Sequence, residues 1–380
     1  MLHERALSFS RSGRWLIGCL TALAVLSACG GDPDAAAVSS SAAPPAAPPA
    51  LPARFAYVAN QSSDSVSAYT INGISGALTL VPSTAATDAA PAALAVDPQG
   101  KFLYTANFSG GSVSAFAINA VSGALTEIAG SPFAADGGAT AIAVDPRGKF
   151  VYAANWDDDS ISAYAVNSTT GVLTNVPGSP FTTGTNPNAV AVDATGKFAY
   201  VASYSDHTLW AYAIDATTGA LTSVGSTVAP GMFLWSVALD PGGKFAYLLS
   251  DNLSTYSIDP STGATTAVAG ASIALVGGGG LTTDPRGLFV YVASALGQVA
   301  AYAANTATGA LTALAGSPYA AGAGTNSVAI DPSGKFAYAV NFGSDDVSAY
   351  TVDAATGGLT PIPGAAARTG SGPRGIVTTR

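Results

Sequence analysis

One strand-like segment returns along this chain at nearly constant intervals. The segment AVDPQGKFLYTAN around Asp97 reappears as AVDPRGKFVYAAN around Asp145 and as AIDPSGKFAYAVN around Asp331. The repeated aspartate occupies positions 97, 145, 193, 240, 284 and 331, so the repeat length stays between 44 and 48 residues. A repeat of this length with strand-forming sequences is typical of a β-propeller, in which each repeat supplies one blade.

Each repeat unit contains four segments with strand character. Stretches such as NAVAVD, FVYAAN, SISAYAV and VLTNVP are rich in small, aromatic and β-branched residues, and they carry no helical period. The Asp-Pro-x-Gly sequence between the first two segments suits a tight turn, because Asp accepts a backbone N–H, Pro presets φ and Gly adopts positive φ. We therefore expect an all-β fold of four-stranded antiparallel blades.

The two ends of the repeat region are incomplete in complementary ways. The region begins at RFAYVAN, without a first segment, and ends at PRGIVTTR, which looks like that missing segment. Pairing of residues 373–378 with residues 55–59 would complete one blade and close the ring, which removes exposed strand edges. The second segments start at a phenylalanine, at positions 55, 102, 150, 198, 245, 289 and 336. The prediction is a seven-bladed β-propeller over residues 54–380.

The N-terminal stretch has the features of a secretory signal. Arginines precede the apolar run WLIGCLTALAVL, which is too short to cross a bilayer, and small residues follow it up to Cys29. The sequence LSACG resembles a bacterial lipobox, and this resemblance implies cleavage after residue 28 and a lipid on Cys29. The alternative is an ordinary signal peptide over residues 1–28 with an incidental cysteine. Residues 29–53, rich in Pro, Ala and Ser, predict an extended linker.

These features predict where the protein resides and what it contacts. A lipid on Cys29 would anchor it to a membrane of the cell envelope, at the outer membrane and periplasm or at the cell surface. The folded region would keep no thiol, because Cys19 would leave with the signal peptide, and this excludes cysteine catalysis. The net charge of −9 excludes the broad basic surface that nucleic-acid binding requires. We expect a monomer whose protein or small-molecule ligand the sequence leaves open.

The complete repeat carries a family resemblance. The pattern P-x-x-x-A-V-D-P-x-G-K-F-x-Y-x-A-N, followed by S-V-S-A-Y and T-G-x-L-T, resembles the lactonase-type seven-bladed propellers over about residues 55–380. That family includes bacterial 6-phosphogluconolactonase, fungal carboxy-muconate cyclase and the related YVTN-repeat surface proteins. The resemblance implies the seven-bladed fold, and it makes lactone hydrolysis or formation a candidate activity. Catalytic members use combinations of His, Arg and Glu around the channel mouth.

The loops after the second segments differ most between repeats, and propellers usually place ligand contacts on that face. One loop reads WDDD, with Asp157, Asp158 and Asp159 in succession. The residues aligned with Asp159 in other repeats are Asp64, Gly111, His207 and Asp345. This variation favours a polar turn, while a calcium site and a catalytic acid–base pair stay open as alternatives. We expect no required cofactor, and Ca²⁺ is the one candidate ion.

Aromatic and amide residues on the same face are candidate ligand contacts. Trp156 and Tyr204 follow the residue that ends the second segment of their repeats, where packing between blades is the alternative. Trp235, within PGMFLWSVALD, departs from the repeat and could wall a pocket. Asn188 stands before a first segment, at a place where the lactonases often have histidine.

Two further residues are candidates for catalysis. His207 could act as a general base for the attack of water on an ester carbonyl, although a lone loop histidine is more often a turn residue. Arg374, just before the closing strand, could hold a carboxylate or phosphate through two hydrogen bonds, or pair with a neighbouring Asp.

Two functions from different classes follow. The first is a cell-envelope lipoprotein that acts as a binding or scaffold module through its Asp- and aromatic-rich face. The alternative is a lactone hydrolase similar to 6-phosphogluconolactonase, acting on a sugar or other lactone, with His207 as base and Arg374 as anion anchor. Asn188 in the place of the family's frequent histidine favours the binding module.

Overall fold

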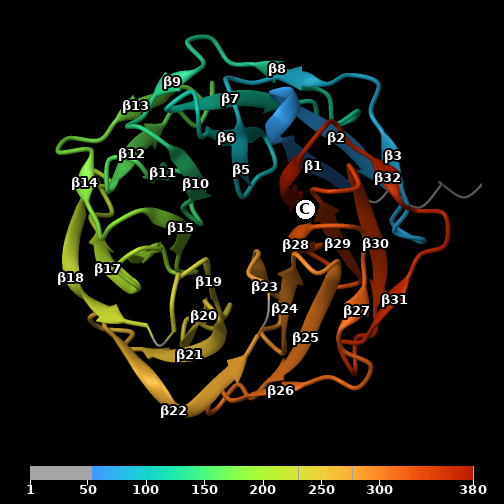
Figure 1. Cartoon of the computed structure of the whole chain (residues 1–380). Coiled ribbons are helices and arrows are strands. Elements are labelled where there is room, and N and C mark those ends of the chain that lie inside the picture. The colour runs from blue at the N-terminus through green and yellow to red at the C-terminus, as the bar shows by residue number, and fades with distance from the viewer. Residues whose placement is uncertain (1–53, 230, 276, 380) are drawn as a thin grey trace, which may run out of the picture. The chain divides into compact units, whose positions relative to one another are not determined.

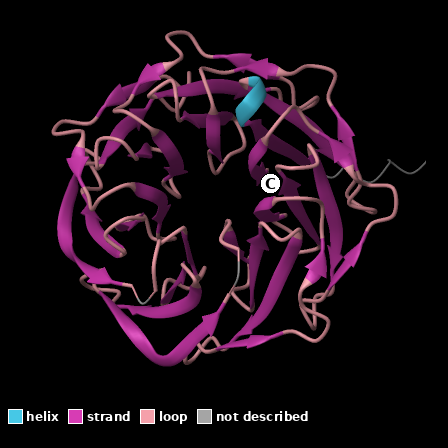
Figure 2. Ribbon diagram, viewed as in Figure 1, coloured by secondary structure: helices cyan, strands magenta, loops and turns pink. Residues whose placement is uncertain are grey.

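The computed structural model describes residues 54–379 apart from residues 230 and 276. These residues form seven separate β-sheets arranged in a ring (Figure 1), and a short 3-10 turn, η1 (Gln61–Ser63), interrupts the strands (Figure 2). Each sheet is antiparallel and contains four main strands, which follow one another in the chain in every sheet except the one that closes the ring; five of the sheets have a short fifth strand. The prediction of an all-β, seven-bladed propeller is confirmed.

The strands occupy four positions from the central axis outward. The innermost strands are β5 (Pro91–Val96), β10 (Ala139–Val144), β15 (Pro187–Val192), β19 (Ser236–Leu239), β23 (Leu281–Thr283), β28 (Thr325–Ile330) and β33 (Pro373–Thr378). The second strands are β1 (Arg54–Asn60), β6 (Phe102–Asn107), β11 (Phe150–Asn155), β16 (Phe198–Ser203), β20 (Phe245–Leu249), β24 (Phe289–Ser294) and β29 (Phe336–Asn341).

The third and outer positions complete the blades. The third strands are β2 (Ser65–Ile71), β7 (Ser112–Ile118), β12 (Ser160–Val166), β17 (Thr208–Ile214), β21 (Asn252–Ile258), β25 (Gln298–Ala304) and β30 (Asp346–Val352). The outer strands are β3 (Leu78–Leu80), β4 (Ala85–Ala86), β8 (Leu125–Glu127), β9 (Phe133–Ala134), β13 (Leu173–Asn175), β14 (Phe181–Thr182), β18 (Leu221–Val228), β22 (Thr265–Ala274), β26 (Leu311–Ala313), β27 (Tyr319–Ala320), β31 (Leu359–Pro361) and β32 (Ala367–Arg368).

The C-terminal strand closes the ring. β33 pairs antiparallel with β1, with Tyr57 opposite Val377 and Val58 opposite Ile376, so one sheet has the order β3-β2-β1-β33. In Figure 1 the red C-terminal strand accordingly lies beside the blue N-terminal blade. The innermost strands contact one another in sequence around the axis, and β33 contacts both β5 and β28. The predicted pairing of residues 373–378 with residues 55–59 is therefore confirmed.

The second strands are buried on both faces because each blade is covered by its two neighbours. Every residue of β6, β11 and β16 is buried, which explains why their sequences read as continuous apolar or small runs without polar alternation. The core clusters cross from blade to blade, and one of them joins Tyr104 of β6 to Val151 and Ala153 of β11. Packing between blades therefore supplies the hydrophobic stabilisation.

Two repeated polar contacts fix the blade geometry. In the Asp-Pro-x-Gly turn, Asp97 Oδ1 accepts the backbone N–H of Lys101 at 2.6 Å and that of Phe102 at 2.7 Å. On the second strand, the Tyr57 hydroxyl donates to the carbonyl of Gly123 in the next blade at 3.0 Å. Gly123 adopts φ of +73°, and a Cβ there would lie 2.4 Å from the Phe55 ring, so glycine is required.

Some sequence predictions concern residues outside the described part of the chain. The signal peptide over residues 1–28, the lipid on Cys29 and the linker over residues 29–53 all lie there. Among the residues that the structure describes, no helix has the length and apolar character needed to cross a membrane.

Candidate functional site

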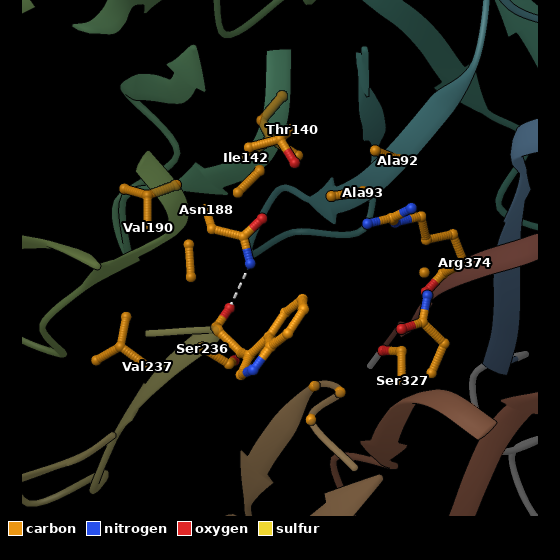
Figure 3. Close-up of a pocket in the computed structure, with 18 residues that line it drawn as sticks. Ala92, Ala93, Thr140, Ile142, Asn188, Val190, Ser236, Val237, Ser327 and Arg374 are labelled. Atoms are coloured by element: carbon orange, nitrogen blue, oxygen red, sulfur yellow. Dashed lines mark hydrogen bonds between the residues drawn. The ribbon is translucent and has the colours of Figure 1, made fainter. Parts of the chain in front are cut away.

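One residue from every blade lines a hollow on the propeller axis. Each lies five positions before the repeated aspartate, or before Thr379, which takes the place of that aspartate in the closing blade. These residues, here called the mouth ring, are Ala92, Thr140, Asn188, Trp235, Gly279, Asn326 and Arg374. The hollow has a volume of about 230 Å³ (Figure 3). We call it the axial cavity.

A β-bulge presents most of the mouth ring to the axis. In β15 the strand register jumps from Pro187 to Ala189, so Asn188 has no partner opposite it on β16. The same jump passes over Ala92, Thr140, Asn326 and Arg374 in their own blades. A bulge frees a residue from the ladder and redirects its side chain, which is why these positions can face a ligand.

Further along the innermost strands, the cavity wall consists first of small residues and then, one position later, of aliphatic residues. The next residue in each blade is Ala93, Ala141, Ala189, Ser236, Gly280, Ser327 or Gly375, and all of these line the cavity. Ile142, Val190 and Val237 follow one position further along. The small residues leave the open volume, and the aliphatic residues make its lower wall apolar.

Arg374 gives the axial cavity its charge. It is half-buried, and its Nη1 donates to Gln61 Oε1 at 3.2 Å. Within the described residues its side chain forms no ion pair, whereas Arg54, Arg147 and Arg286 each pair with an aspartate. Burial lowers the pKa of Arg374, but a guanidinium stays charged in proteins. A partly desolvated cation with donors to spare is suited to an anionic ligand.

Figure 3 shows the Arg374 guanidinium reaching from its strand toward the space that Thr140 and Asn188 border. Of the described residues that line the axial cavity, Arg374 alone is charged. Asn188 uses its Nδ2 to donate to the backbone carbonyl of Trp235 at 2.7 Å, which leaves its amide oxygen available to a ligand. The polar groups of the site are therefore one cation and neutral donors and acceptors.

A second hollow, also of about 230 Å³, opens beside the first and has aromatic walls. It shares Thr140, Asn188, Trp235 and Arg374 with the axial cavity and adds Gln61, Phe108 and Trp156. We call it the aromatic cavity. The two form one site, because four side chains border both.

Tyr204 holds the aromatic wall together from behind. Its ring lies 5.0 Å from that of Trp156 and meets that of Trp235 edge-on at 4.8 Å. Phe233 stacks on the same ring at 4.7 Å. Of the predicted ligand contacts, Trp156, Trp235 and Asn188 line the aromatic cavity, while Tyr204 supports the two tryptophans. The structure thus brings these four residues together.

His207 serves a turn rather than the cavity. Its Nδ1 accepts the backbone N–H of Phe233 at 2.9 Å, and it is absent from the described residues that line either hollow. In other blades the equivalent carboxylates accept the equivalent backbone N–H: Asp64 from Ala90, Asp159 from Asn186 and Asp345 from Gly372, at 2.7 to 2.8 Å. The structure therefore does not join His207 and Arg374 into the catalytic pair expected from the sequence. The reason is that His207 occupies a left-handed turn position, with φ of +58°.

Two of the WDDD carboxylates also bind backbone groups, Asp158 within its own blade and Asp159 on the segment that leads into the next blade. Asp158 Oδ2 accepts the N–H of Gly137 at 2.5 Å, and Asp159 accepts that of Asn186. Asp157 and Asp158 are exposed. Within the described ranges no three His, Cys, Asp or Glu side chains are grouped to hold a metal ion. These contacts favour the turn interpretation over a calcium site or an acid–base pair.

Several residues that complete the site were not predicted from the sequence, namely Thr140, Asn326, Gln61 and Phe108. Their signal was available in the alignment of repeats. Thr140 and Asn326 stand five residues before the repeated aspartate, as Asn188 does, and Gln61 and Phe108 align with Trp156. What the alignment could not reveal was that these two positions converge in space.

Comparisons with known proteins agree with the fold. The sequence matches the family described as Lactonase, 7-bladed beta-propeller, over residues 50–132, 125–235 and 320–379, which is more than half of the chain. A search of curated proteins gave no match.

Solved structures show the same architecture at low sequence identity. A candidate 6-phosphogluconolactonase from Bacteroides fragilis NCTC 9343 is 21% identical with a TM-score of 0.75, over 88% of this chain and 100% of that one. The periplasmic gluconolactonase of Pseudomonas aeruginosa is 18% identical with a TM-score of 0.71, over 86% and 99%. Together with the family match, the architecture leads to one conclusion: this chain belongs to the lactonase family of seven-bladed β-propellers.

Proposed function

We propose that this protein hydrolyses a lactone in the joined axial and aromatic cavities. The observation that carries the proposal is Arg374, a half-buried cation that borders both cavities and forms no ion pair in the described part of the chain. Membership of the lactonase family supports the same activity.

The chemistry of lactone opening explains why such a cation is useful. Water adds to the carbonyl carbon and loses one proton to solvent, which leaves a tetrahedral intermediate with negative charge on the former carbonyl oxygen. The ring C–O bond then breaks, and the ring oxygen takes up a proton to give a hydroxy acid. Arg374 can donate to the developing oxyanion and to the product carboxylate. Thr140 and Asn326 add neutral hydrogen-bonding groups around the same space. Stabilisation of negative charge is the contribution that this set of residues offers.

A binding module is the second candidate function, and one observation favours it. No imidazole or carboxylate lies among the described residues that line either cavity, so the site lacks an evident general base for water. In a binding module, Arg374 would hold an anion without any turnover. The family match favours hydrolysis between the two.

Turnover of a lactone panel separates the two functions. The purified protein should release acid from at least one lactone, and Arg374→Gln should lower kcat/KM by tenfold or more, because it removes a charged donor to the oxyanion. Arg368→Gln is the matched control, since Arg368 is exposed on the outer strand β32. Ligand binding without hydrolysis of any lactone would leave the binding module as the function.

We also propose that the protein is a lipoprotein of the cell envelope. The support is the sequence of residues 1–53, together with the similar fold of a periplasmic gluconolactonase. Expression in a bacterium with labelled palmitate should label the wild-type protein and move it to the membrane fraction. Cys29→Ala should abolish both effects, and a labelled Cys29→Ala protein would contradict the anchor.

A further inference from the structure

We propose that the site selects a ligand with a single carboxylate and a flat, apolar body. This inference rests on the proposed function, since the carboxylate belongs to the acid formed when the lactone opens. The substrate would then be an uncharged lactone with an aryl or similar apolar group. Arg374 would bind the carboxylate, and Trp235 and Trp156 would cover the body.

The charge of the site fits one carboxylate better than a phosphate. Arg374 is the sole cation among the described residues bordering the two cavities. A phosphate group carries a charge of about −1.5 to −2 at neutral pH, and clusters of cations are its usual partners. A carboxylate carries one charge, and its two oxygens match the fork of one guanidinium. The single positive charge of Arg374 would not neutralise the phosphate of a sugar phosphate in this site.

The walls of the aromatic cavity fit an apolar body better than a polyhydroxylated one. Phe108, Trp156 and Trp235 border the aromatic cavity, next to Arg374. Burying a hydroxyl group against such walls without a hydrogen bond is costly. A flat apolar ring instead gains area against the indole faces.

The main stacking surface is fixed in place before a ligand arrives. The Trp235 backbone carbonyl accepts a hydrogen bond from Asn188 Nδ2 at 2.7 Å, and the Tyr204 and Trp235 rings make an edge contact. A Cβ at Gly278 would lie 2.6 Å from the indole, so the backbone approaches the ring closely on that side. A wall that is already ordered loses little conformational entropy on binding, which increases affinity.

Each of the two cavities has room for about one ring. Each cavity holds about 230 Å³, whereas pockets for drug-sized ligands range over roughly 300–1,000 Å³. A single ring in the aromatic cavity leaves its carboxylate beside Arg374, because Arg374 borders both cavities.

Four probes test the ligand class by titration calorimetry on the purified protein: phenylacetate, 2-phenylethanol, gluconate and 6-phosphogluconate. Phenylacetate and 2-phenylethanol share the phenyl ring, and only phenylacetate has a carboxylate. Gluconate keeps the carboxylate but has a polyhydroxylated chain in place of the ring, and 6-phosphogluconate adds a phosphate to that chain. We expect phenylacetate to bind at least tenfold more tightly than each of the other three. Tighter binding of gluconate or 6-phosphogluconate than of phenylacetate would overturn the proposal.

Variants of Arg374 and Trp235 test which residue binds the carboxylate and which contacts the apolar body. Arg374→Gln should weaken phenylacetate about tenfold and leave 2-phenylethanol unchanged. Trp235→Leu should weaken both phenyl compounds, while Trp235→Phe should keep most of their affinity and guards against a folding defect. Arg368→Gln and Phe342→Leu are controls, since both residues are exposed. Phenylacetate binding that ignores Arg374→Gln would also refute the proposal.

The same protein sample separates this inference from the proposed function. Hydrolysis of gluconolactone with no affinity for phenylacetate would refute the ligand class and leave lactone hydrolysis intact. Arg374-dependent binding of phenylacetate with no hydrolysis of any lactone would refute the activity and keep the ligand class. Hydrolysis of an aryl-substituted lactone in preference to gluconolactone would support both.

Discussion

His207 accepts the backbone N–H of Phe233 through Nδ1, in the same way that the Asp159 carboxylate accepts the N–H of Asn186. The contact joins two blades, because Phe233 belongs to the loop that leads into β19 and His207 to the loop before β17. Phe233 in turn stacks on Tyr204, which supports Trp235. The histidine therefore stabilises the aromatic wall from outside the cavity.

Exchange of His207 for Asp tests this assignment. His207→Asp should keep the melting temperature and any lactone turnover, because Asp makes the same contact at Asp64 and Asp345 with a similar positive φ. His207→Leu should lose about 0.5–1.5 kcal/mol of stability, the net contribution of one hydrogen bond, because the exposed N–H of Phe233 would then bind water. Thermal melting and turnover measure both. A folded His207→Asp protein without activity would restore His207 as a candidate base.

Gly278→Ala should displace Trp235. The added Cβ would lie 2.6 Å from the indole ring, so the ring must shift, at a cost of about 1–3 kcal/mol. We expect lower stability and weaker binding of phenylacetate, read from melting and calorimetry. Gly73→Ala is the control, since a Cβ there meets nothing within 4 Å. Equal behaviour of the two variants would contradict the packing described for Trp235.

Calcium should not stabilise the protein. The carboxylates of Asp158 and Asp159 already accept backbone N–H groups, and a ligand that binds only the native state would raise the melting temperature. Melting with millimolar Ca²⁺ and with a chelator should give the same temperature. A rise of several degrees in calcium that disappears in Asp157→Asn would revive the cation site.

High pH should unfold the protein. Burial raises the pKa of Tyr69 and of Tyr164 from the ordinary tyrosine value of 10.0 to about 12. A group with a raised folded pKa contributes stability that is fully present below its unfolded pKa and is lost as pH rises toward the folded value. The melting temperature should therefore fall between about pH 10 and pH 12. Tyrosine absorbance should follow the unfolding transition, and full ionisation of these side chains in the folded protein would contradict their burial.

A charge on the closing strand should open the ring. Ile376 is 8% exposed on β33 and pairs with Val58 of β1, so Ile376→Asp places a carboxylate in the core. We expect a loss of more than about 3 kcal/mol and association through the freed strand edges, measured by melting and gel filtration. Val121→Asp is the control, because Val121 is 86% exposed in a turn. A stable monomeric Ile376→Asp protein would argue against closure by β33.

The fold was predictable because its determinants are local and repeated. Each blade carries its own Asp-Pro-x-Gly turn, and the turn at Asp97 forms the expected side-chain contacts to Lys101 and Phe102. The missing first segment at one end and the extra segment at the other identified the closing pair. Neither inference needed contacts between distant side chains.

The site was only partly predictable because it depends on contacts between blades. The alignment placed His207 with Asp159 but could not show that its partner, Phe233, lies in the next blade. Trp235 was chosen as a departure from the repeat, and Asn188 because it stands where the lactonases often have histidine. The carbonyl contact that joins the two residues became visible only in three dimensions. The bulge that exposes Arg374 to the axis leaves no local sign in the sequence.

The bulges have a consequence for how this propeller can change. Asn188 has no partner in its strand ladder, so its replacement leaves the register and the ladder hydrogen bonds of the blade intact and removes only the side-chain contact to the Trp235 carbonyl. Asn326 and Arg374 likewise have no partner opposite them in the strand ladders of their own blades. A mutation that alters one of these side chains alters recognition at little cost in stability. Combinatorial libraries confined to the bulged positions, Ala92, Thr140, Asn188, Asn326 and Arg374, should therefore yield folded proteins with new ligands, which makes these five positions a natural starting point for directed evolution.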